Sequence, residues 1–173
     1  MYKKIIIGLL CLTLAVTFVY RDTKAQPKRT TTPPEISYTV SMSKPATHLL
    51  EVEMRLKLPD AQKAVDLKMP VWTPGSYLIR EYERHVEDLK AADAAGKPLS
   101  WQKTNKNTWR ISNEGAREFA VTYNVYANEL TVRTNELNDG HAFWNNAALL
   151  MFPDGQISAP SQITVKPFGN WKI

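Results

Sequence analysis

The chain has 173 residues, of which 43% are hydrophobic, and a formal net charge of +5 at pH 7. This length and apolar content suit one globular domain and argue against an extended, disordered chain. Most of the excess positive charge lies near the N-terminus, because the residues after position 25 contain 18 basic and 16 acidic side chains. A nearly neutral body argues against nucleic acid as a partner, since phosphate binding needs a clustered basic surface.

The first 25 residues have the pattern of a secretory signal peptide. Lys3 and Lys4 form a short positive region, residues 5–20 are an uninterrupted apolar run, and Ala25 supplies a small residue at the cleavage position. Cleavage predicts an exported protein, either periplasmic or secreted. The alternative is an uncleaved membrane anchor, although the run is shorter than the roughly 20 residues that a spanning helix needs. Cys11, the single cysteine, would leave with the signal, so no disulfide is expected.

The remainder divides into a leader, residues 26–35, and a body, residues 36–173. The leader is polar and rich in proline, which predicts a flexible segment. In the body, the segment at residues 48–58 alternates strictly from Leu50 to Leu58: its even positions are apolar, and the positions between them are charged. A period of two predicts a strand with one face in a core and the other in water.

Similar patterns mark further strands, separated by turns rich in glycine, asparagine and proline. The predicted strands are residues 36–42, 48–58, 65–69, 86–92, 99–103, 107–112, 118–127, 130–134, 148–152 and 162–167. Residues 77–89 have helical spacing over a short stretch, which suits either a single turn or an extended crossing. Many short strands with frequent turns predict one all-β domain, either an antiparallel β-sandwich or a saddle-like sheet.

The residues of this chain predict no catalytic or metal site. His48, His85 and His141 have no partner at helix-turn spacing, and the HExxH pattern of a zinc hydrolase is absent. A triad of Ser76, His141 and Asp139 can be drawn, but no GxSxG motif supports it. We therefore expect this chain alone to bind no cofactor and to be inactive as an enzyme.

Residues 70–86 combine a turn with aromatic and arginine side chains. Pro74 and Gly75 suit the central positions of a type II turn, where glycine supplies the positive φ. The candidate interface or substrate residues in this segment are Trp72, Tyr77, Arg80 and Arg84. Two interpretations are open. Either the cluster braces a crossover within the domain, or it forms a rim that grips a peptide or a partner domain.

Within residues 130–152, polar side chains alternate with Phe143 and Trp144 between Arg133 and Asn146. The candidate residues in this segment are Arg133, Asn135, Asp139, His141 and Asn145. They either satisfy the backbone of a long loop or belong to a loop aimed at a neighbouring site.

These two segments resemble the N-terminal domain of the glycyl aminopeptidase family of zinc metallopeptidases. The first matching element is WTPGSYLIR at residues 72–80, followed by an aromatic–arginine pair. The second joins RTN at residues 133–135 to DGHAFWN at residues 139–145, and GNW follows at residues 169–171. The resemblance covers residues 36–171.

The resemblance implies a β-rich domain followed by a thermolysin-like zinc domain that contains HExxH, often with a PDZ-like domain behind it. Zinc, the peptide substrate and the catalytic residues are thus expected outside this chain, which is expected to be a fragment ending at a domain edge. Its implied role is to pack on the downstream zinc domain and to shape one side of the substrate cleft. This hypothesis predicts an exposed apolar patch.

The alternative function is a free-standing module that binds carbohydrate or peptide. It would use Trp72, Tyr77, Tyr82 and Trp144 as a stacking platform, and it predicts that these rings are exposed on one face.

Overall fold

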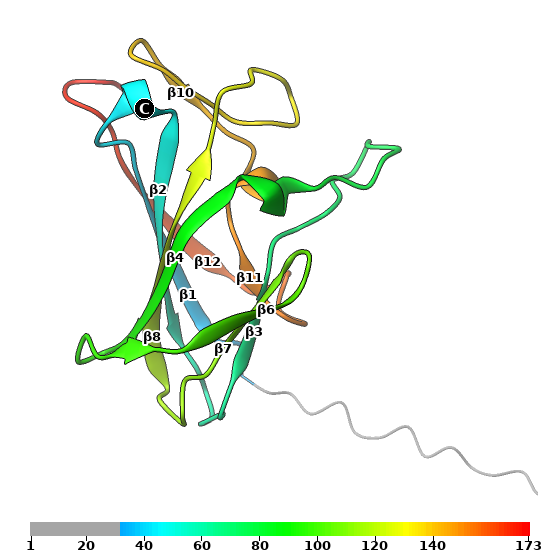
Figure 1. Cartoon of the computed structure of the whole chain (residues 1–173), viewed down its shortest axis with the longest axis vertical. Coiled ribbons are helices and arrows are strands. Elements are labelled where there is room, and N and C mark those ends of the chain that lie inside the picture. The colour runs from blue at the N-terminus through cyan, green and yellow to red at the C-terminus, as the bar shows by residue number, and fades with distance from the viewer. Residues whose placement is uncertain (1–31) are drawn as a thin grey trace, which may run out of the picture. The chain divides into compact units, whose positions relative to one another are not determined.

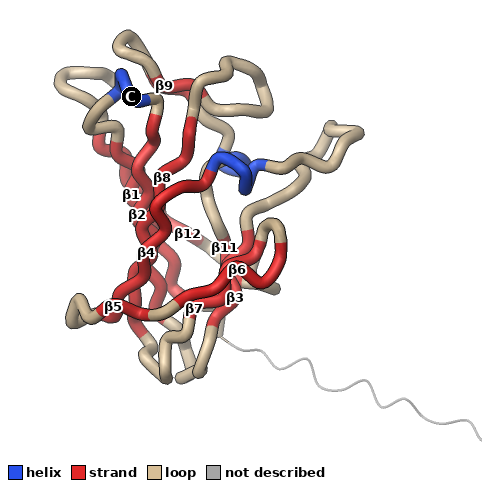
Figure 2. The backbone as a smooth tube through the Cα atoms, in the orientation of Figure 1, coloured by secondary structure: helices blue, strands red, loops and turns tan. Residues whose placement is uncertain are grey.

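The structure, a computed structural model, describes residues 32–173. These residues form strands and short 3-10 helices with no α-helix among them (Figure 1). Figure 2 shows the strands gathered in the sheets and long loops between and beyond them. The predicted all-β fold is confirmed. The predicted signal peptide and most of the leader lie outside the described residues. Nothing in residues 32–173 is helical over a length, or with an apolar content, that could cross a membrane.

The strands form three sheets. In chain order they are β1 (Glu35–Ser41), β2 (Leu49–Lys57), β3 (Val65–Lys68), β4 (Val86–Asp93), β5 (Pro98–Leu99), β6 (Trp101–Asn105), β7 (Thr108–Ile111), β8 (Glu118–Tyr126), β9 (Glu136–Leu137), β10 (Ala142–Phe143), β11 (Phe152–Pro153) and β12 (Ser161–Lys166). The 3-10 helices are η1 (Pro45–Thr47), η2 (Tyr82–His85) and η3 (Asn146–Ala148). The sheet orders are β12-β1-β2-β8-β4-β5, β11-β3-β7-β6 and β10-β9. The pairing is antiparallel throughout these sheets, except that β12 runs parallel to β1.

Alternation along β2 and β8 builds the centre of the six-stranded sheet. The two strands pair without a break from Leu49 opposite Tyr126 to Lys57 opposite Glu118. The even positions of β2, predicted to face a core, are all buried: Leu50, Val52, Met54 and Leu56. Side chains of one parity share one face of a strand, so the register fixes which face is apolar. The predicted core face is confirmed.

The four-stranded sheet contributes to the same core. Leu67 of β3 is fully buried, as is Ile111 of β7, and Trp109 is 3% exposed. These side chains belong to one hydrophobic cluster with the inner face of the six-stranded sheet. The two sheets thus bury their apolar faces together, as a sandwich-like domain requires.

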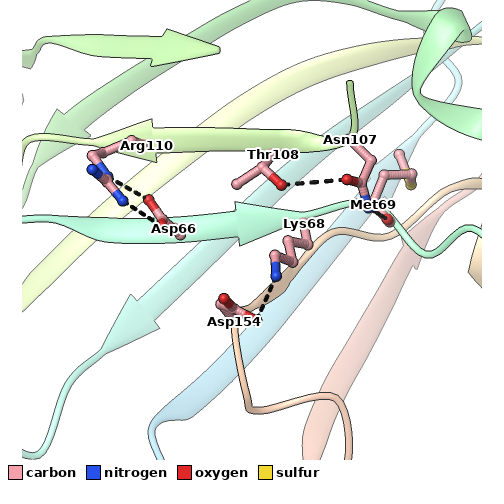
Figure 3. A network of polar contacts seen from close by, with 7 residues as sticks. All are labelled: Asp66, Lys68, Met69, Asn107, Thr108, Arg110 and Asp154. Carbon is pink, nitrogen blue, oxygen red and sulfur yellow. Dashed lines mark hydrogen bonds and ion pairs between the residues drawn. The ribbon is translucent and has the colours of Figure 1, made fainter. Parts of the chain in front are cut away.

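A polar network covers part of the four-stranded sheet (Figure 3). Arg110 donates from Nε and Nη2 to the two carboxylate oxygens of Asp66, both at 2.7 Å. The two residues are directly opposite each other in the pairing of β3 with β7. The next charged residue of β3, Lys68, forms an ion pair of 2.8 Å with Asp154. These side chains give the sheet a solvated face opposite its buried one.

Two predicted strands are wrong as strands. Residues 130–134 form a loop in which Leu130 is 61% exposed and Val132 is 79% exposed. They alternate in sequence, but no neighbouring strand pairs with them among the described residues. Of residues 148–152, the four apolar residues 148–151 are buried but lie outside any strand, and only the half-buried Phe152 belongs to one, β11. Residues 99–103, predicted as one strand, are divided between β5 and β6 of different sheets.

Tyrosine hydroxyls replace ladder hydrogen bonds for the buried segment before β11. The hydroxyl of Tyr123 donates to the carbonyl of Leu149 and accepts from the N–H of Met151, each at 3.0 Å. The hydroxyl of Tyr38 donates to the carbonyl of Met151 at 2.5 Å. A buried backbone group needs a partner, and here side chains of the six-stranded sheet supply it.

Candidate functional site

Residues 71–80 form a loop that is closed at its base and ordered within, and we name it the apolar loop. The N–H of Arg80 donates to the carbonyl of Val71 at 2.7 Å and closes the neck. At the tip, the N–H of Ser76 donates to the carbonyl of Thr73 at 3.1 Å, and Gly75 has a φ of +84°. This is the predicted type II turn.

The tip of the apolar loop exposes large hydrophobic side chains. Tyr77 is fully exposed, Ile79 is 72% exposed and Leu78 is 61% exposed. Trp72 is about half exposed, and its ring N–H is tied to the carbonyl of Ser76 at 2.6 Å. Figure 1 shows the loop projecting away from the sheets between β3 and η2. The tip of the apolar loop therefore exposes a small apolar surface to solvent.

The residues after the apolar loop turn back into the domain. In η2, Tyr82 and Glu83 are buried, whereas Arg84 is exposed and donates from Nε to Nε2 of His85 at 3.1 Å. The His85 ring stacks on Tyr126 with centroids 6.4 Å apart. The structure therefore divides the first candidate segment in two. Trp72 and Tyr77 form an exposed rim, and Tyr82 braces the chain.

Two candidate asparagines of the second segment brace a loop. Asn135 is 5% exposed, and it donates to the carbonyl of Ala148 at 2.9 Å and accepts from the N–H of Asn145 at 3.0 Å. Asn145 accepts from the N–H of Ala147 at the start of η3 and donates to the carbonyl of Val132. Both asparagines thus hydrogen-bond backbone groups of the loop, as expected if they serve to hold a long loop in place.

The other candidates of that segment are exposed and lie on different loops. Asp139 and His141 belong to the turn between β9 and β10, where Asn138 accepts from the N–H of His141 at 3.1 Å. Arg133 lies on the loop beside Val132. His141 lines one pocket together with Trp144, whereas Asn135 lines another together with Tyr82. The structure does not gather the polar side chains of this segment into one site.

The four rings proposed as a stacking platform do not form one. Tyr82 is 4% exposed, and Trp144 packs against the hydrophobic core. Only Trp72 and Tyr77 remain on the surface, and both belong to the apolar loop.

A pocket of about 270 Å³ with mainly apolar accessible walls lies between η2 and residues 126–135, and the sequence did not predict it. Its walls include Tyr126, Asn128 and Glu129, which follow directly from the end of β8. Nothing in the spacing of these residues signals a pocket, because η2 comes from a distant part of the sequence. Across residues 32–173, no three His, Cys, Asp or Glu side chains are placed to hold a metal ion.

A comparison with protein families decides the relationship. The profile of the Peptidase M61 N-terminal domain matches residues 37–173. The chain belongs to the Peptidase M61 N-terminal domain family. The resemblance to the N-terminal domain of a peptidase is thus confirmed over almost the whole predicted body. No curated protein matches the chain significantly.

The solved structures that match the chain are much longer than it is. An aminopeptidase N family protein from Idiomarina loihiensis matches this M61 N-terminal domain with a TM-score of 0.71 and 29% identity over 77% of the chain. An M1 zinc metallopeptidase from Deinococcus radiodurans aligns with a TM-score of 0.43 and 12% identity over 78% of the chain. The chain covers 22% of the first protein and 32% of the second.

Both motifs of the resemblance have a place in the M61 N-terminal domain. Residues 72–80 make the apolar loop, with the type II turn at its tip. Residues 133–145 make the braced segment that ends at η3. The first motif thus produces exposed apolar surface, and the second mainly fixes loop geometry.

Proposed function

We propose that this domain is the non-catalytic N-terminal part of an exported, glycyl-aminopeptidase-like zinc enzyme. In this proposal it packs on the zinc catalytic domain and forms one side of the peptide cleft. Zinc and the catalytic residues belong to that partner domain, and this chain supplies binding surface only. Membership in the M61 N-terminal domain family supports the parent enzyme class.

The apolar loop is the observation that carries this proposal. Its neck and turn are fixed by backbone hydrogen bonds, yet Tyr77, Leu78 and Ile79 point into water. Full burial of one large apolar side chain stabilises a structure by about 1.5–3 kcal/mol. A pre-ordered loop loses little conformational entropy when it docks. A rigid apolar projection is therefore suited to insertion into a neighbouring domain.

The first test concerns activity and the coding sequence. The purified chain, supplied with zinc, is expected to release no amino acid from glycyl peptides. The codons after Ile173 are expected to encode a zinc domain with HExxH. Zinc-dependent cleavage by the chain, abolished by a chelator, would contradict the non-catalytic role, and a continuation without a zinc domain would contradict the parentage.

The second test concerns the interface in the full-length enzyme. Replacing Leu78 and Ile79 by serine is expected to lower the thermal stability of the catalytic domain and to reduce kcat/KM at least several-fold. Ile157→Ser is the matched control, since Ile157 is 68% exposed and lies near β12 instead. Equal behaviour of the loop variant and the control would remove the loop from the interface.

Export is tested by N-terminal sequencing of the protein made in cells. Cleavage predicts a mature chain that begins at Gln26. An intact Met1 in a membrane fraction would instead support the alternative of an uncleaved anchor.

A further inference from the structure

The six-stranded sheet ends in an edge strand, β12, that is open along one side. Within residues 32–173, only β1 pairs with β12, which stands last in the sheet order. Every residue of β12 is exposed except Val165, which is half-buried. A strand at the edge of a sheet leaves a row of N–H and C=O groups without partners on its outer side. β12 therefore exposes a row of backbone groups to which another strand can pair.

The other three edges of the two larger sheets in residues 32–173 are protected. β5 and β11 are each two residues long, and each contains a proline, Pro98 and Pro153. The pairing of β6 with β7 is interrupted by a register shift. Short strands, prolines and bulges all prevent a sheet edge from pairing with another strand. β12 has none of them, since its register with β1 is unbroken and its six residues include no proline.

The apolar face of the sheet continues across β12. Ile163 and Val165 are opposite Tyr38 and Val40 of β1, which are both buried in the core. Residues that are opposite each other in neighbouring strands lie on the same face of the sheet. Ile163, however, is 38% exposed. The core face thus ends in solvent at Ile163, and one more strand beside β12 would cover this side chain.

The sequence of β12 is complementary to itself in an antiparallel pair. A two-fold axis places the same faces of both copies together, so the paired positions must have the same parity. When the axis passes through Thr164, Ile163 is opposite Val165 of the second copy. On the other face, Gln162 is opposite Lys166 of the second copy, and Thr164 is opposite its own equivalent. Apolar side chains then meet apolar ones, and no lysine is opposite a lysine.

We propose that β12 pairs antiparallel with β12 of a second copy of this chain, about a two-fold axis at Thr164. One continuous sheet then runs through both copies. Main-chain hydrogen bonds supply the affinity, and the side-chain pairs supply the register. Each copy has one such edge, so the assembly closes at two copies. The dimer needs neither a catalytic domain nor the apolar loop, so its failure and the failure of the proposed function are separate outcomes.

Sedimentation velocity of the purified chain tests for the dimer. One strand pair is a small interface, so we expect a Kd of about 10–100 µM. Hydrogen–deuterium exchange locates the contact: the outward N–H groups of β12 should exchange more slowly above the Kd than below it, whereas those of β6 should not change. A chain that stays monomeric up to about 500 µM overturns the proposal. A dimer that leaves the exchange of β12 unchanged overturns it too.

Charge variants test the register. Thr164→Lys and Thr164→Glu each place two like charges opposite each other on the axis, so each is expected to weaken the dimer by about threefold or more. An equal mixture of the two variants should dimerise again, because lysine is then opposite glutamate. Recovery in the mixture also shows that both variants are folded. Thr104→Lys, in the exposed strand β6, is the matched control and is expected to dimerise as the unaltered chain does. No recovery in the mixture, or equal dimerisation of Thr164→Lys and the control, contradicts the proposed pairing.

A loop variant separates this dimer from any association through the apolar loop. The chain with Leu78→Ser and Ile79→Ser is expected to keep the dimer and the slowed exchange of β12. Loss of the dimer in this variant would assign the contact to the loop and overturn the pairing of β12.

Discussion

At the scale of single residues, two buried tyrosines connect the six-stranded sheet to the irregular segment before β11. Burial raises the pKa of Tyr38 to about 12. Burial likewise raises the pKa of Tyr123, and by more, against the opposing effect of its bond from the Met151 N–H. Both hydroxyls therefore remain protonated, and able to donate, over the whole physiological range.

Removing the Tyr123 hydroxyl should destabilise the domain. Tyr123→Phe leaves the carbonyl of Leu149 and the N–H of Met151 without this partner, and such losses cost about 1–3 kcal/mol. The measurement is the free energy of unfolding in urea. Tyr77→Phe is the control, because its ring is fully exposed and its hydroxyl faces water. Equal unfolding free energies for the two variants would contradict the bracing role of Tyr123.

The Asp66–Arg110 pair predicts a pH-dependent contribution to stability. The hydrogen bonds from Arg110 lower the pKa of Asp66, despite partial desolvation, and the charges of Arg110 and Lys68 add to the effect. A depressed carboxyl pKa stabilises the fold above the unfolded value of about 3.9 and loses this effect as pH falls through the folded value.

Asp66→Asn should therefore lower the Tm by a few degrees at most near pH 7, because exposed ion pairs are weak. The difference from the unaltered chain should shrink steadily below about pH 4. Thermal unfolding between pH 7 and pH 2 measures it. A difference that persists unchanged at pH 2 would show that the ion pair is not its source.

The candidate residues differ in how far the sequence could predict their roles. The turn at Pro74 and Gly75 was predictable, because a type II turn depends on the two residues at its centre. The burial of Tyr82 was not, since it depends on packing between η2 and the distant end of β8. The sequence left two roles open for Asn135 and Asn145, and only their hydrogen bonds to the loop backbone favour the structural role.

At the scale of elements, the sequence correctly predicted the strands that have one apolar and one polar face. It also predicted strands in segments that have no neighbouring strand to pair with. β2 and β8 alternate buried and more exposed residues over nine positions each. Only a pairing register that places the apolar side chains of both strands on the same face can bury them. Residues 130–134 have comparable local character but no strand to pair with. Residues 148–151 are buried without forming a strand, because tyrosine and asparagine side chains hydrogen-bond their backbone.

A pair of substitutions distinguishes these two apolar segments. Leu149→Ala should lower the unfolding free energy by about 2–5 kcal/mol, because Leu149 is fully buried. Val132→Ala should change it by less than about 0.5 kcal/mol, because Val132 is 79% exposed. Urea unfolding of both variants provides the measurement. A large loss for Val132→Ala would mean that the loop packs against the domain.

At the scale of the whole molecule, a well-packed two-sheet core coexists with exposed apolar side chains at the tip of one ordered loop. These side chains add nothing to the core, since they are in water in the isolated domain. Exposed apolar clusters of this kind promote association with other surfaces. The isolated chain should therefore self-associate weakly as its concentration rises.

Replacing Tyr77, Leu78 and Ile79 together by serine should reduce that self-association while leaving the unfolding free energy within about 0.5 kcal/mol of the original. Sedimentation velocity over a range of concentrations and urea unfolding provide the two readouts. Ile157→Ser again serves as the control, with comparable exposure at a different place. If the triple variant associates as strongly as the control, the surface responsible for self-association lies elsewhere. If it instead loses stability, the loop contributes to the fold and is not a surface reserved for a partner.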